Sequence, residues 1–419
     1  MCVQSCAPSG LRLFLGRTAR GTDVYGKDAM ERAVHHRRGL GAALAGGAAG
    51  LLTLLALTAA GASAHAATRP SSQAPHACAS RVGGPTHVGR FGGISRAVPV
   101  RASCQVHNTS DAANGTPPLI FHGGPVMGTQ STGPVVVTPI FWNPAGHPMA
   151  TAYRNILSTY LGDVASASGQ HSNVYSTLNE YFGANGAIRY RIELGNPIND
   201  VSPLPRDGCK VNGQDTARIY ADNSGYNACL DDAQVTAEID NIVTARGLPR
   251  DFGHIYVMFL PKHVESCFFA GSTTTSSNFC TINHQPSAAY CAYHSQAASG
   301  SVYANLPFPI YSSPVGFTCG SDARFPQIET PNGNPDADTE VSPTSHEVME
   351  AITDPDTSTG WYDSSGFENG DECAYVFGAT QGTSGQLYNQ VIRRHHYLTQ
   401  EEFSNLDFAQ TGGGCLQSE

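Results

Sequence analysis

The sequence is poor in charged residues, and poorest in basic ones. Only 14% of its 419 residues are charged, with 24 Lys and Arg against 34 Asp and Glu, a formal net charge of −10. Residues 1–66 hold seven of the basic and three of the acidic residues, so the remainder carries 17 against 31 and a net charge of −14. A surface of this sign argues against binding to nucleic acid or to anionic membrane.

Several familiar catalytic motifs are absent as well. The sequence has no GxSxG nucleophile elbow, no P-loop and no glycine-rich dinucleotide fingerprint. A serine hydrolase of the nucleophile-elbow type, a P-loop NTPase and a dinucleotide-dependent enzyme therefore have no support in the sequence.

One long apolar run is present, near the N-terminus. A basic cluster at residues 35–38 precedes a stretch rich in small residues and leucine at 39–61, and small-x-small sites at 62–64 and 64–66 follow at once. This order is typical of a secretory signal rather than a membrane span. We expect residues 1–66 to be a signal peptide, with Met30 as an alternative start, and the mature chain to be extracellular without a membrane span. Both Sec and twin-arginine export stay open, and the residues around Arg37 and Arg38 favour Sec.

The cysteine count fits an oxidising compartment. Two of the 12 cysteines lie upstream of Met30, and the ten that remain can form five disulfides. Even pairing also argues against a cysteine nucleophile. We expect three of the pairs to be Cys209 with Cys229, Cys267 with Cys280, and Cys373 with Cys415.

The order of apolar patterns predicts an α/β fold, a disulfide-rich mixed sheet flanked by helices, and the HExxE string at 346–350 makes the expected fold zincin-like. An irregular arm at residues 67–117, tied down through Cys78 and Cys104, precedes one globular domain at 118–419. Apolar runs and alternation predict strands at 135–142, 188–194 and 255–260. Helical spacing predicts helices at 149–161, at 174–182 and from Asp231 or Asp232 to Gly247. Residues 261–317 are expected to be irregular, with an edge strand at 302–310 because of its prolines.

The metal-capable side chains gather between residues 342 and 375. His346, Glu347 and Glu350 form an HExxE string in a helix that we expect to begin after Pro343, capped by Ser342, Thr344 or Ser345. Because positions i and i+4 share a face, His346 and Glu350 can hold one ion while Glu347 lies at its flank. This is the layout of the zincin HExxH helix with its second His replaced by Glu, which makes Glu347 the expected general base. An exposed acidic helix turn is the structural alternative.

Further ligands are needed, and the acidic residues that follow can supply them. We expect Asp354 and Asp371 to complete the site, and zinc to be the ion. One histidine with several carboxylates is a hard ligand set, so calcium and manganese stay open. ENGDE at 368–372 can equally be a tight Asn-Gly turn. The candidates of second rank for the site, each with a structural alternative, are His122, His294 and Glu368.

Taken together, these blocks resemble the exordium/phosphate-induced protein family. The resemblance rests on FHGGPVM at 121–127, CAYH at 291–294, SHEVMEAITDP at 345–355 with WYD after it, ENGDEC at 368–373 and YLTQEEFSN at 397–405 with GGC after it. It implies secretion and an extracellular or cell-wall location, but no established chemistry.

Two hypotheses of function follow. The first is a secreted metal-dependent hydrolase, acting on a peptide or a cell-wall polymer, with Glu347 as the general base. The second is a non-catalytic extracellular protein that holds a structural ion and docks to wall polymers through exposed Tyr and Trp residues.

Overall fold

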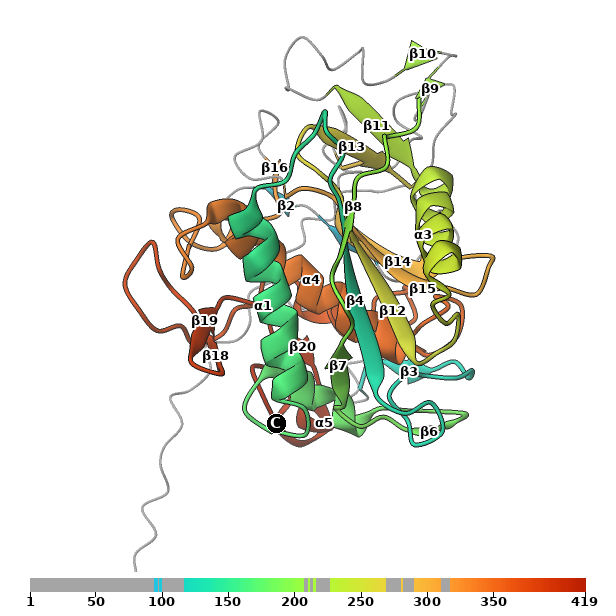
Figure 1. The fold of residues 1–419 in the computed structure, drawn as a ribbon. Coiled ribbons are helices and arrows are strands. Elements are labelled where there is room, and N and C mark those ends of the chain that lie inside the picture. Colours follow the sequence, from blue (N-terminus) through green and yellow to red (C-terminus); the bar gives the residue numbers. More distant parts are fainter. Residues whose placement is uncertain are drawn as a thin grey trace, which may run out of the picture. The chain divides into compact units, whose positions relative to one another are not determined.

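The structure, a computed structural model, describes residues 94–96, 98–99, 117–206, 210–211, 214–215, 227–268, 280–281, 290–309 and 317–419 (Figure 1). Contacts between Cα atoms divide the chain into Met1–Ala67 and Thr68–Glu419, and every described element belongs to the second unit. The expected signal peptide, Met30 and the arm cysteines Cys78 and Cys104 lie outside the described residues. Within them, no helix combines the length and apolar character needed to cross a membrane.

A seven-stranded mixed sheet forms the centre of the second unit (Figure 1). Its strands, in spatial order, are β1 (Ile94–Arg96), β14 (Tyr290–Gln296), β15 (Val302–Leu306), β12 (His254–Phe259), β4 (Val135–Trp142) and β7 (Ile192–Leu194), with β8 (Ile198–Asp200) also on β4. The pairs among β15, β12, β4, β7 and β8 are parallel, whereas β14 is antiparallel to both β15 and β1. The expected α/β class and mixed sheet are confirmed.

Helices cover both faces of this sheet, which explains why its central strands are apolar throughout. Ile255, Val257 and Phe259 of β12 belong to the same core as α1 (Thr151–Ser166) and α4 (Pro335–Thr353). Tyr256 and Met258 point the other way, into the core formed with α3 (Asp232–Arg246). Successive side chains of a strand alternate between faces, so β12 joins the two cores.

Predictions based on local signals are largely confirmed. β4 has the predicted bounds, β12 is central, and α3 is capped by Asp231 and ends at Gly247, whose φ is 62°. The helix predicted at 149–161 is α1, and residues 174–182 contain the 3-10 helix Val174–Glu180. Only β7 forms within the predicted strand at 188–194, although Ile188, Tyr190 and Ile192 alternate with exposed residues as expected.

The predicted edge strand at 302–310 is wrong in its position. β15 lies between β14 and β12, inside the sheet. Its strand ends at Leu306, so Pro307 and Pro309 fall after the ladder and remove no hydrogen bond from it. The prediction of irregular structure at 261–317 is also wrong, because the CAYH block lies in β14, which is fully buried over its first five residues.

The start of the metal-bearing helix is corrected too. α4 begins at Pro335, with Asn334 as the N-cap accepting from the Ala337 backbone N–H, and Pro343 lies inside it. Pro343 cannot donate to the carbonyl four residues earlier, which normally breaks a helix. α4 continues because its residues from Ala337 to Thr353 are almost all buried, and tertiary packing outweighs the local cost.

Small strand pairs and short helices complete the described residues. Two of the pairs involve the arm, which is therefore not wholly irregular: β1 on β14, and β2 (Val98–Pro99) on β16 (Phe317–Thr318). The other pairs are β3 (Ile120–Phe121) with β17 (Trp361–Tyr362), β5 (Phe182–Gly183) with β6 (Gly186–Ala187), β9 (Lys210–Val211) with β10 (Gln214–Asp215), β11 (Ala228–Asp231) with β13 (Val264–Cys267), β18 (Gln390–Ile392) with β19 (His395–Tyr397), and β20 (Glu402–Phe403) with β21 (Cys415–Leu416). The short helices are the 3-10 helices Ser321–Ala323 and Asp371–Cys373, and α5 (Asn405–Thr411).

Three disulfides join described cysteines. Cys267–Cys280 and Cys373–Cys415 confirm two of the predicted pairs, and Cys291–Cys319 is a third that was not predicted. Cys229 is also disulfide-bonded, and its predicted partner, Cys209, lies outside the described residues.

Candidate metal centre

The last turns of α4 carry His346, Glu347 and Glu350, whose side chains have no exposed surface. The i, i+4 spacing places His346 and Glu350 on one face of the helix. α4 packs against β14, and the segment that follows α4 turns back over its end. These two elements bring four further predicted residues to the same place: His294, Asp354, Glu368 and Asp371.

Three of these side chains converge closely enough to share an ion. His346 Nε2 is 2.9 Å from Glu350 Oε1 and 3.7 Å from Asp371 Oδ1, and the three ligand atoms lie within 4.8 Å of one another. Ligand atoms about 2.0 Å from a tetrahedral zinc ion are ~3.3 Å apart, so these distances fit. Neither ring nitrogen of His346 makes a hydrogen bond of good geometry with a described residue, in spite of the short contact to Glu350. The neutral ring therefore has a nitrogen lone pair to offer.

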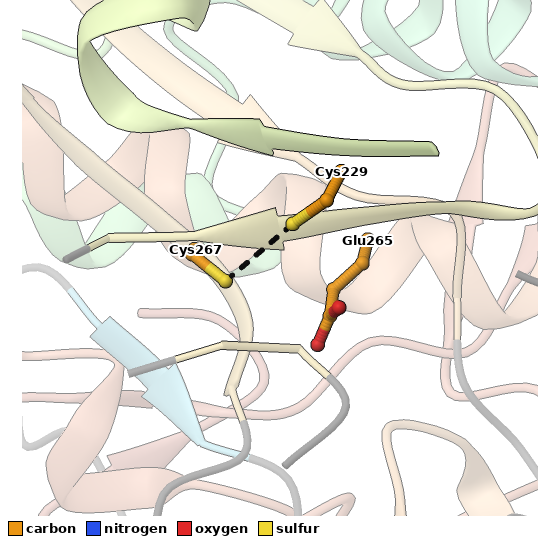
Figure 2. A group of neighbouring side chains, drawn as sticks. All are labelled: Cys229, Glu265 and Cys267. Atoms are coloured by element: carbon orange, nitrogen blue, oxygen red, sulfur yellow. Dashed lines mark hydrogen bonds between the residues drawn. The ribbon is translucent and has the colours of Figure 1, made fainter. Parts of the chain in front are cut away.

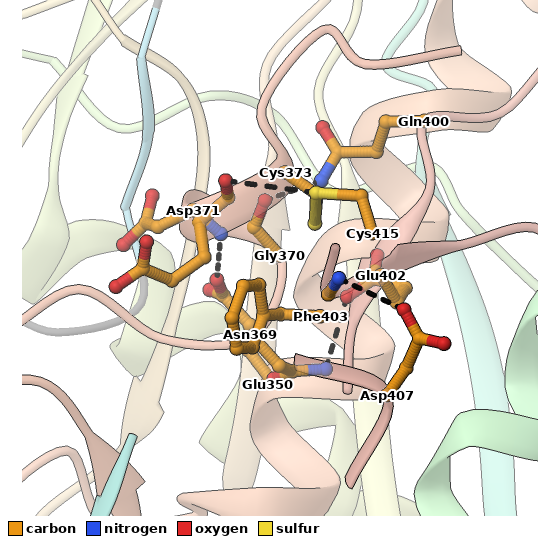
Figure 3. Close-up of a disulfide and its surroundings, with 12 residues drawn as sticks. Glu350, Asn369, Gly370, Asp371, Cys373, Gln400, Glu402, Phe403, Asp407 and Cys415 are labelled. Carbon is orange, nitrogen blue, oxygen red and sulfur yellow. Dashed lines mark hydrogen bonds between the residues drawn. A yellow bond between two sulfur atoms is a disulfide. The ribbon is translucent and has the colours of Figure 1, made fainter. Parts of the chain in front are cut away.

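Gly370 is what allows the acidic segment to approach the helix. A Cβ atom at this position would lie 2.8 Å from His346 Cγ and 2.9 Å from Glu350 Oε1, closer than real side chains allow. Figure 3 shows how the segment is held: the Asp371 N–H donates to Glu350 Oε1 at 3.0 Å, and Gln400 Nε2 donates to the Gly370 carbonyl at 2.6 Å. The disulfide Cys373–Cys415 anchors it on the other side.

Glu368 and Asp354 bring two more buried carboxylates to the cluster. Both are fully buried, and apart from a backbone hydrogen bond from Thr357 to Asp354 no donor among the described residues reaches their oxygens. The two carboxyl groups lie close enough to interact, and Glu368 Oε2 is 3.8 Å from His294 Nε2. Buried carboxylates without donors are costly, so they point to a proton or a cation between them.

The charges of the cluster favour a cation. Among the described residues, the ion-pair partners of Glu347, Glu350 and Glu368 are His294 and His346 only. Asp354 and Asp371 add two further carboxyl groups, so five acidic side chains lie around these two histidines. A divalent ion neutralises two of them at once, and carboxylate and imidazole groups are its ordinary ligands. The donor set fits a divalent metal.

The direction of the pKa shifts agrees with this excess of negative charge. Burial, with the charges of Glu350 and Asp354, raises the pKa of Glu368 well above its usual value, and burial raises the pKa of Asp354 to about 6. Burial by itself lowers the pKa of His346, but the neighbouring carboxylates, Glu350 first, outweigh it and raise that pKa well above 6.5. The cluster thus attracts protons, which a bound cation would displace.

Glu347 has both carboxylate oxygens engaged. Its Oε2 is 3.2 Å from His294 Nδ1, and its Oε1 accepts a hydrogen bond from the backbone N–H of Ser95 at 3.1 Å. His294 Nε2 in turn lies 2.9 Å from the carbonyl oxygen of Asp354. Glu347 is therefore at the flank of the His346–Glu350 pair, as predicted, and is held there by two elements of the sheet, β14 and β1.

A second cluster of possible metal ligands cannot hold an ion. It consists of Cys229, Glu265 and Cys267 (Figure 2). Its two sulfur atoms are 3.7 Å apart, but Cys267 is bonded to Cys280 and Cys229 is also in a disulfide. Metal ligation needs a thiolate, and a disulfide sulfur is not one.

Not every predicted residue lies at the centre. His122 is exposed, stacks on the Tyr362 ring with centroids 3.6 Å apart, and has its Nε2 3.2 Å from the Tyr362 carbonyl oxygen, so the structure does not place it among the ligands. Within ENGDE, Asn369 and Gly370 form a turn, and the 3-10 helix Asp371–Cys373 follows at once.

Some residues of the site were not predicted at all. Glu402 is fully buried and accepts from Asn369 Nδ2 at 2.9 Å, which steadies the residue next to Gly370. β20 is two residues long and lies in a polar stretch, so no local signal in the sequence singles Glu402 out. Ser95 had no such signal either. Its contact with Glu347 spans 252 residues and uses the backbone N–H of Ser95 rather than its side chain.

The ligand set rests on the geometry of this chain alone. No protein-family model, no curated protein and no solved structure matches the chain.

Proposed function

We propose that the chain is a secreted, zincin-like, metal-dependent hydrolase of the exordium type. The observation that carries the proposal is the convergence of His346 Nε2, Glu350 Oε1 and Asp371 Oδ1 at separations of 2.9 and 3.7 Å from the histidine nitrogen. The excess of buried carboxylates around them, the HExxE string and the disulfides support it.

His346, Glu350 and Asp371 would hold the ion. Zinc is the first choice, because three N and O ligands with one open position is the arrangement of catalytic zinc, and calcium is the alternative because carboxylates dominate. When bound, the ion supplies a lowered pKa for a water molecule and polarisation of the substrate carbonyl. Glu368 and Asp354 add negative charge beside it.

Glu347 would act as the general base, and His294 as the residue that positions it. Hydrolysis of an amide adds a hydroxyl group to the carbonyl carbon and a proton to the departing nitrogen, and Glu347 would carry that proton from water to nitrogen. His294 can donate to Glu347 Oε2 and to the Asp354 carbonyl at once only when protonated. Burial lowers the pKa of His294, but Glu347 and Glu350 outweigh it and raise that pKa.

A structural ion is the second candidate, and one observation favours it. His346, Glu347 and Glu350 are fully buried, and Asp371 is only 7% exposed, so the centre is closed to a macromolecular substrate in this conformation. A closed site of this kind suits an ion that holds α4 to the acidic segment of an extracellular binding protein.

The substitution Glu347→Gln separates the two candidates. We would measure metal content of the purified chain and hydrolysis of unstructured polypeptides and cell-wall polysaccharides, with Glu193→Gln as the matched control, because Glu193 is exposed on β7. For a hydrolase, Glu347→Gln should keep its metal and lose activity by about 100-fold or more, and the control should keep both. A metal-bound chain without activity on either substrate class would favour the structural ion, and a metal-free chain would remove both candidates.

A further inference from the structure

Glu350 approaches two histidines, one with each of its carboxylate oxygens. Its Oε1 is 2.9 Å from His346 Nε2 and belongs to the ligand set of the proposed ion, the first ion. Its Oε2 is 3.7 Å from His294 Nδ1 and accepts no hydrogen bond from a described residue. His346 comes from α4 and His294 from β14, so a ring of the helix and a ring of the sheet share this carboxylate. The first ion uses only one of its two oxygens.

Glu368 completes a second group of three ligand atoms around the other oxygen. His294, Glu350 and Glu368 each offer one atom, and these atoms lie within 4.8 Å of one another in side chains without exposed surface. Neither oxygen of Glu368 accepts a hydrogen bond from a described residue, and its carboxyl group interacts with that of Glu350. Two buried carboxyl groups that meet without a donor need a proton or a cation between them.

His294 is oriented as a metal-binding histidine usually is. Its Nε2 is 2.9 Å from the carbonyl oxygen of Asp354, which can only accept, so Nε2 carries a hydrogen. A histidine that binds a metal through one nitrogen ordinarily donates the other N–H to a backbone carbonyl or a carboxylate. In the neutral ring Nδ1 then has a lone pair, and it lies 3.7 Å from Glu350 Oε2 and 3.2 Å from Glu347 Oε2. A lone pair beside two carboxylate oxygens is repelled unless a proton or a cation lies among them.

We propose that the centre holds two divalent ions bridged by the carboxylate of Glu350. The second ion binds His294 Nδ1, Glu350 Oε2 and an oxygen of Glu368, while Glu350 Oε1 stays with the first ion. This inference rests on the first ion of the proposed function, but it does not depend on hydrolysis. Because Nδ1 cannot hold a proton and an ion at once, the second ion replaces the proton through which His294 holds Glu347 in the singly loaded centre.

The charges favour a second ion and also make it the weaker of the two. Among the described residues, no Lys or Arg forms an ion pair with Glu347, Glu350 or Glu368. His346 must be neutral to bind the first ion, so its ring no longer offsets the charge of a carboxylate. A second cation supplies positive charge where these buried groups meet. Two cations that share one carboxylate repel each other, so we expect the second ion to bind after the first and more weakly.

Titration of the metal-free, full-length chain with zinc alone tests the number of ions. Native mass spectrometry should show a first and then a second bound zinc. His294→Ala and Glu368→Gln should each weaken the binding of the second zinc by about 100-fold and leave the first in place, because each removes a ligand of the second ion only. The matched controls are His122→Ala and Glu193→Gln, at exposed positions, and both should bind two zinc ions as the wild type does.

Manganese tests whether the two ions are neighbours. In the unmodified chain loaded with Mn²⁺, electron paramagnetic resonance should show exchange coupling, since one carboxylate joins the two ions. His294→Ala should lose this coupling and give the spectrum of an isolated ion. A second ion without coupling in the wild type would lie elsewhere on the chain, and it would overturn the bridged pair.

The two measurements also separate this inference from the proposed hydrolase. A single zinc in the wild type, or a second zinc that both His294→Ala and Glu368→Gln retain, would overturn the pair. A single zinc together with hydrolysis that Glu347→Gln abolishes would keep the hydrolase and reject the second ion. Two coupled ions in a chain without hydrolysis would keep the pair and reject the hydrolase.

Discussion

His346 Nε2 and Glu350 Oε1 lie 2.9 Å apart, one helical turn from each other, in side chains without exposed surface. Among the described residues, no Lys or Arg forms an ion pair with Glu350, whose partners are His294 and His346. A buried pair of this kind is stable when an ion or a proton completes it. Much of the behaviour of the centre should therefore depend on whether a cation is bound.

Removal of metal should destabilise the chain. An ion held at 1,000 times its dissociation constant stabilises the folded state by about 4 kcal/mol, and for a chain of this size that is a fall in Tm of about 5 °C on chelation. Differential scanning calorimetry before and after treatment with a zinc chelator measures it. Zinc should restore the Tm and magnesium should not, because magnesium demands octahedral oxygen ligation. An unchanged Tm, in a preparation shown to contain metal, would contradict the assignment.

His346→Ala should abolish tight metal binding. The substitution removes the nitrogen that lies closest to both Glu350 and Asp371, and loss of one of three protein ligands should weaken the affinity by about 100-fold or more. Competition with a chromophoric chelator gives the affinity. His122→Ala is the control, because His122 is exposed and stacks on Tyr362. Equal loss in both variants would show that the histidines act through folding rather than ligation.

Gly370→Ala should damage the centre by steric contact alone. The new methyl group would meet His346 Cγ at 2.8 Å and Glu350 Oε1 at 2.9 Å, so one of the two must move. Gly370 has φ −73°, which alanine adopts without strain. We expect metal affinity to fall by about 10–100-fold and stability by about 1–3 kcal/mol.

A matched control for Gly370→Ala is Gly146→Ala. A Cβ atom at Gly146 meets nothing within 4 Å. Its metal affinity and Tm should stay at the wild-type values, and a similar loss in both variants would argue against a tight approach at Gly370.

The parts of this fold that could be predicted from the sequence are those with local signals. α3 has its cap, its apolar face and its terminal glycine within 17 residues, and β4 and β12 are apolar runs that only a sheet covered on both faces can bury. The HExxE string likewise fixes His346 and Glu350 on one face by helix geometry alone. These features were predicted correctly because no distant partner decides them.

The remaining features depend on partners far away in the sequence. α4 runs through Pro343 because tertiary packing buries it on nearly all sides, which no local rule at Pro343 anticipates. β15 is interior because β14 covers it, and the prolines after Leu306 suggested the opposite. The choice of Asp371 and Glu368 from the acidic segment depends on how Gly370 passes over His346, and the contact between Ser95 and Glu347 leaves no pattern in either stretch.

Loss of the disulfide Cys373–Cys415 should weaken metal binding by disturbing the position of Asp371. This disulfide closes a separation of 42 residues and follows the ligand by two positions, whereas Cys267–Cys280 closes 13. Loop-closure entropy predicts losses of about 4 and about 3 kcal/mol for the two bonds. Chains with Ser at both positions of one pair should therefore differ little in stability. Only the Cys373 and Cys415 variant should lose metal affinity, by about 10-fold, and equal metal affinity in the two chains would contradict the coupling.

Glu401 should make the chain less stable as the pH rises towards 8, independently of the metal. Burial, with the charge of Asp407, raises the pKa of Glu401 to about 8, against 4.5 for an ordinary glutamate. Below pH 4.5 the group is protonated in both states. Between 4.5 and 8 the unfolded chain ionises first, so the free energy of unfolding falls with rising pH, and above 8 the effect is complete.

Glu401→Gln removes the charge and should therefore stabilise the chain by about 1–3 kcal/mol at pH 8, after allowance for partial exposure, and by almost nothing at pH 4. Urea unfolding at both pH values measures the difference, with Glu193→Gln, on the exposed side of β7, as the control. A stabilisation that is the same at pH 4 and pH 8 would show that packing, not ionisation, is what the substitution changes.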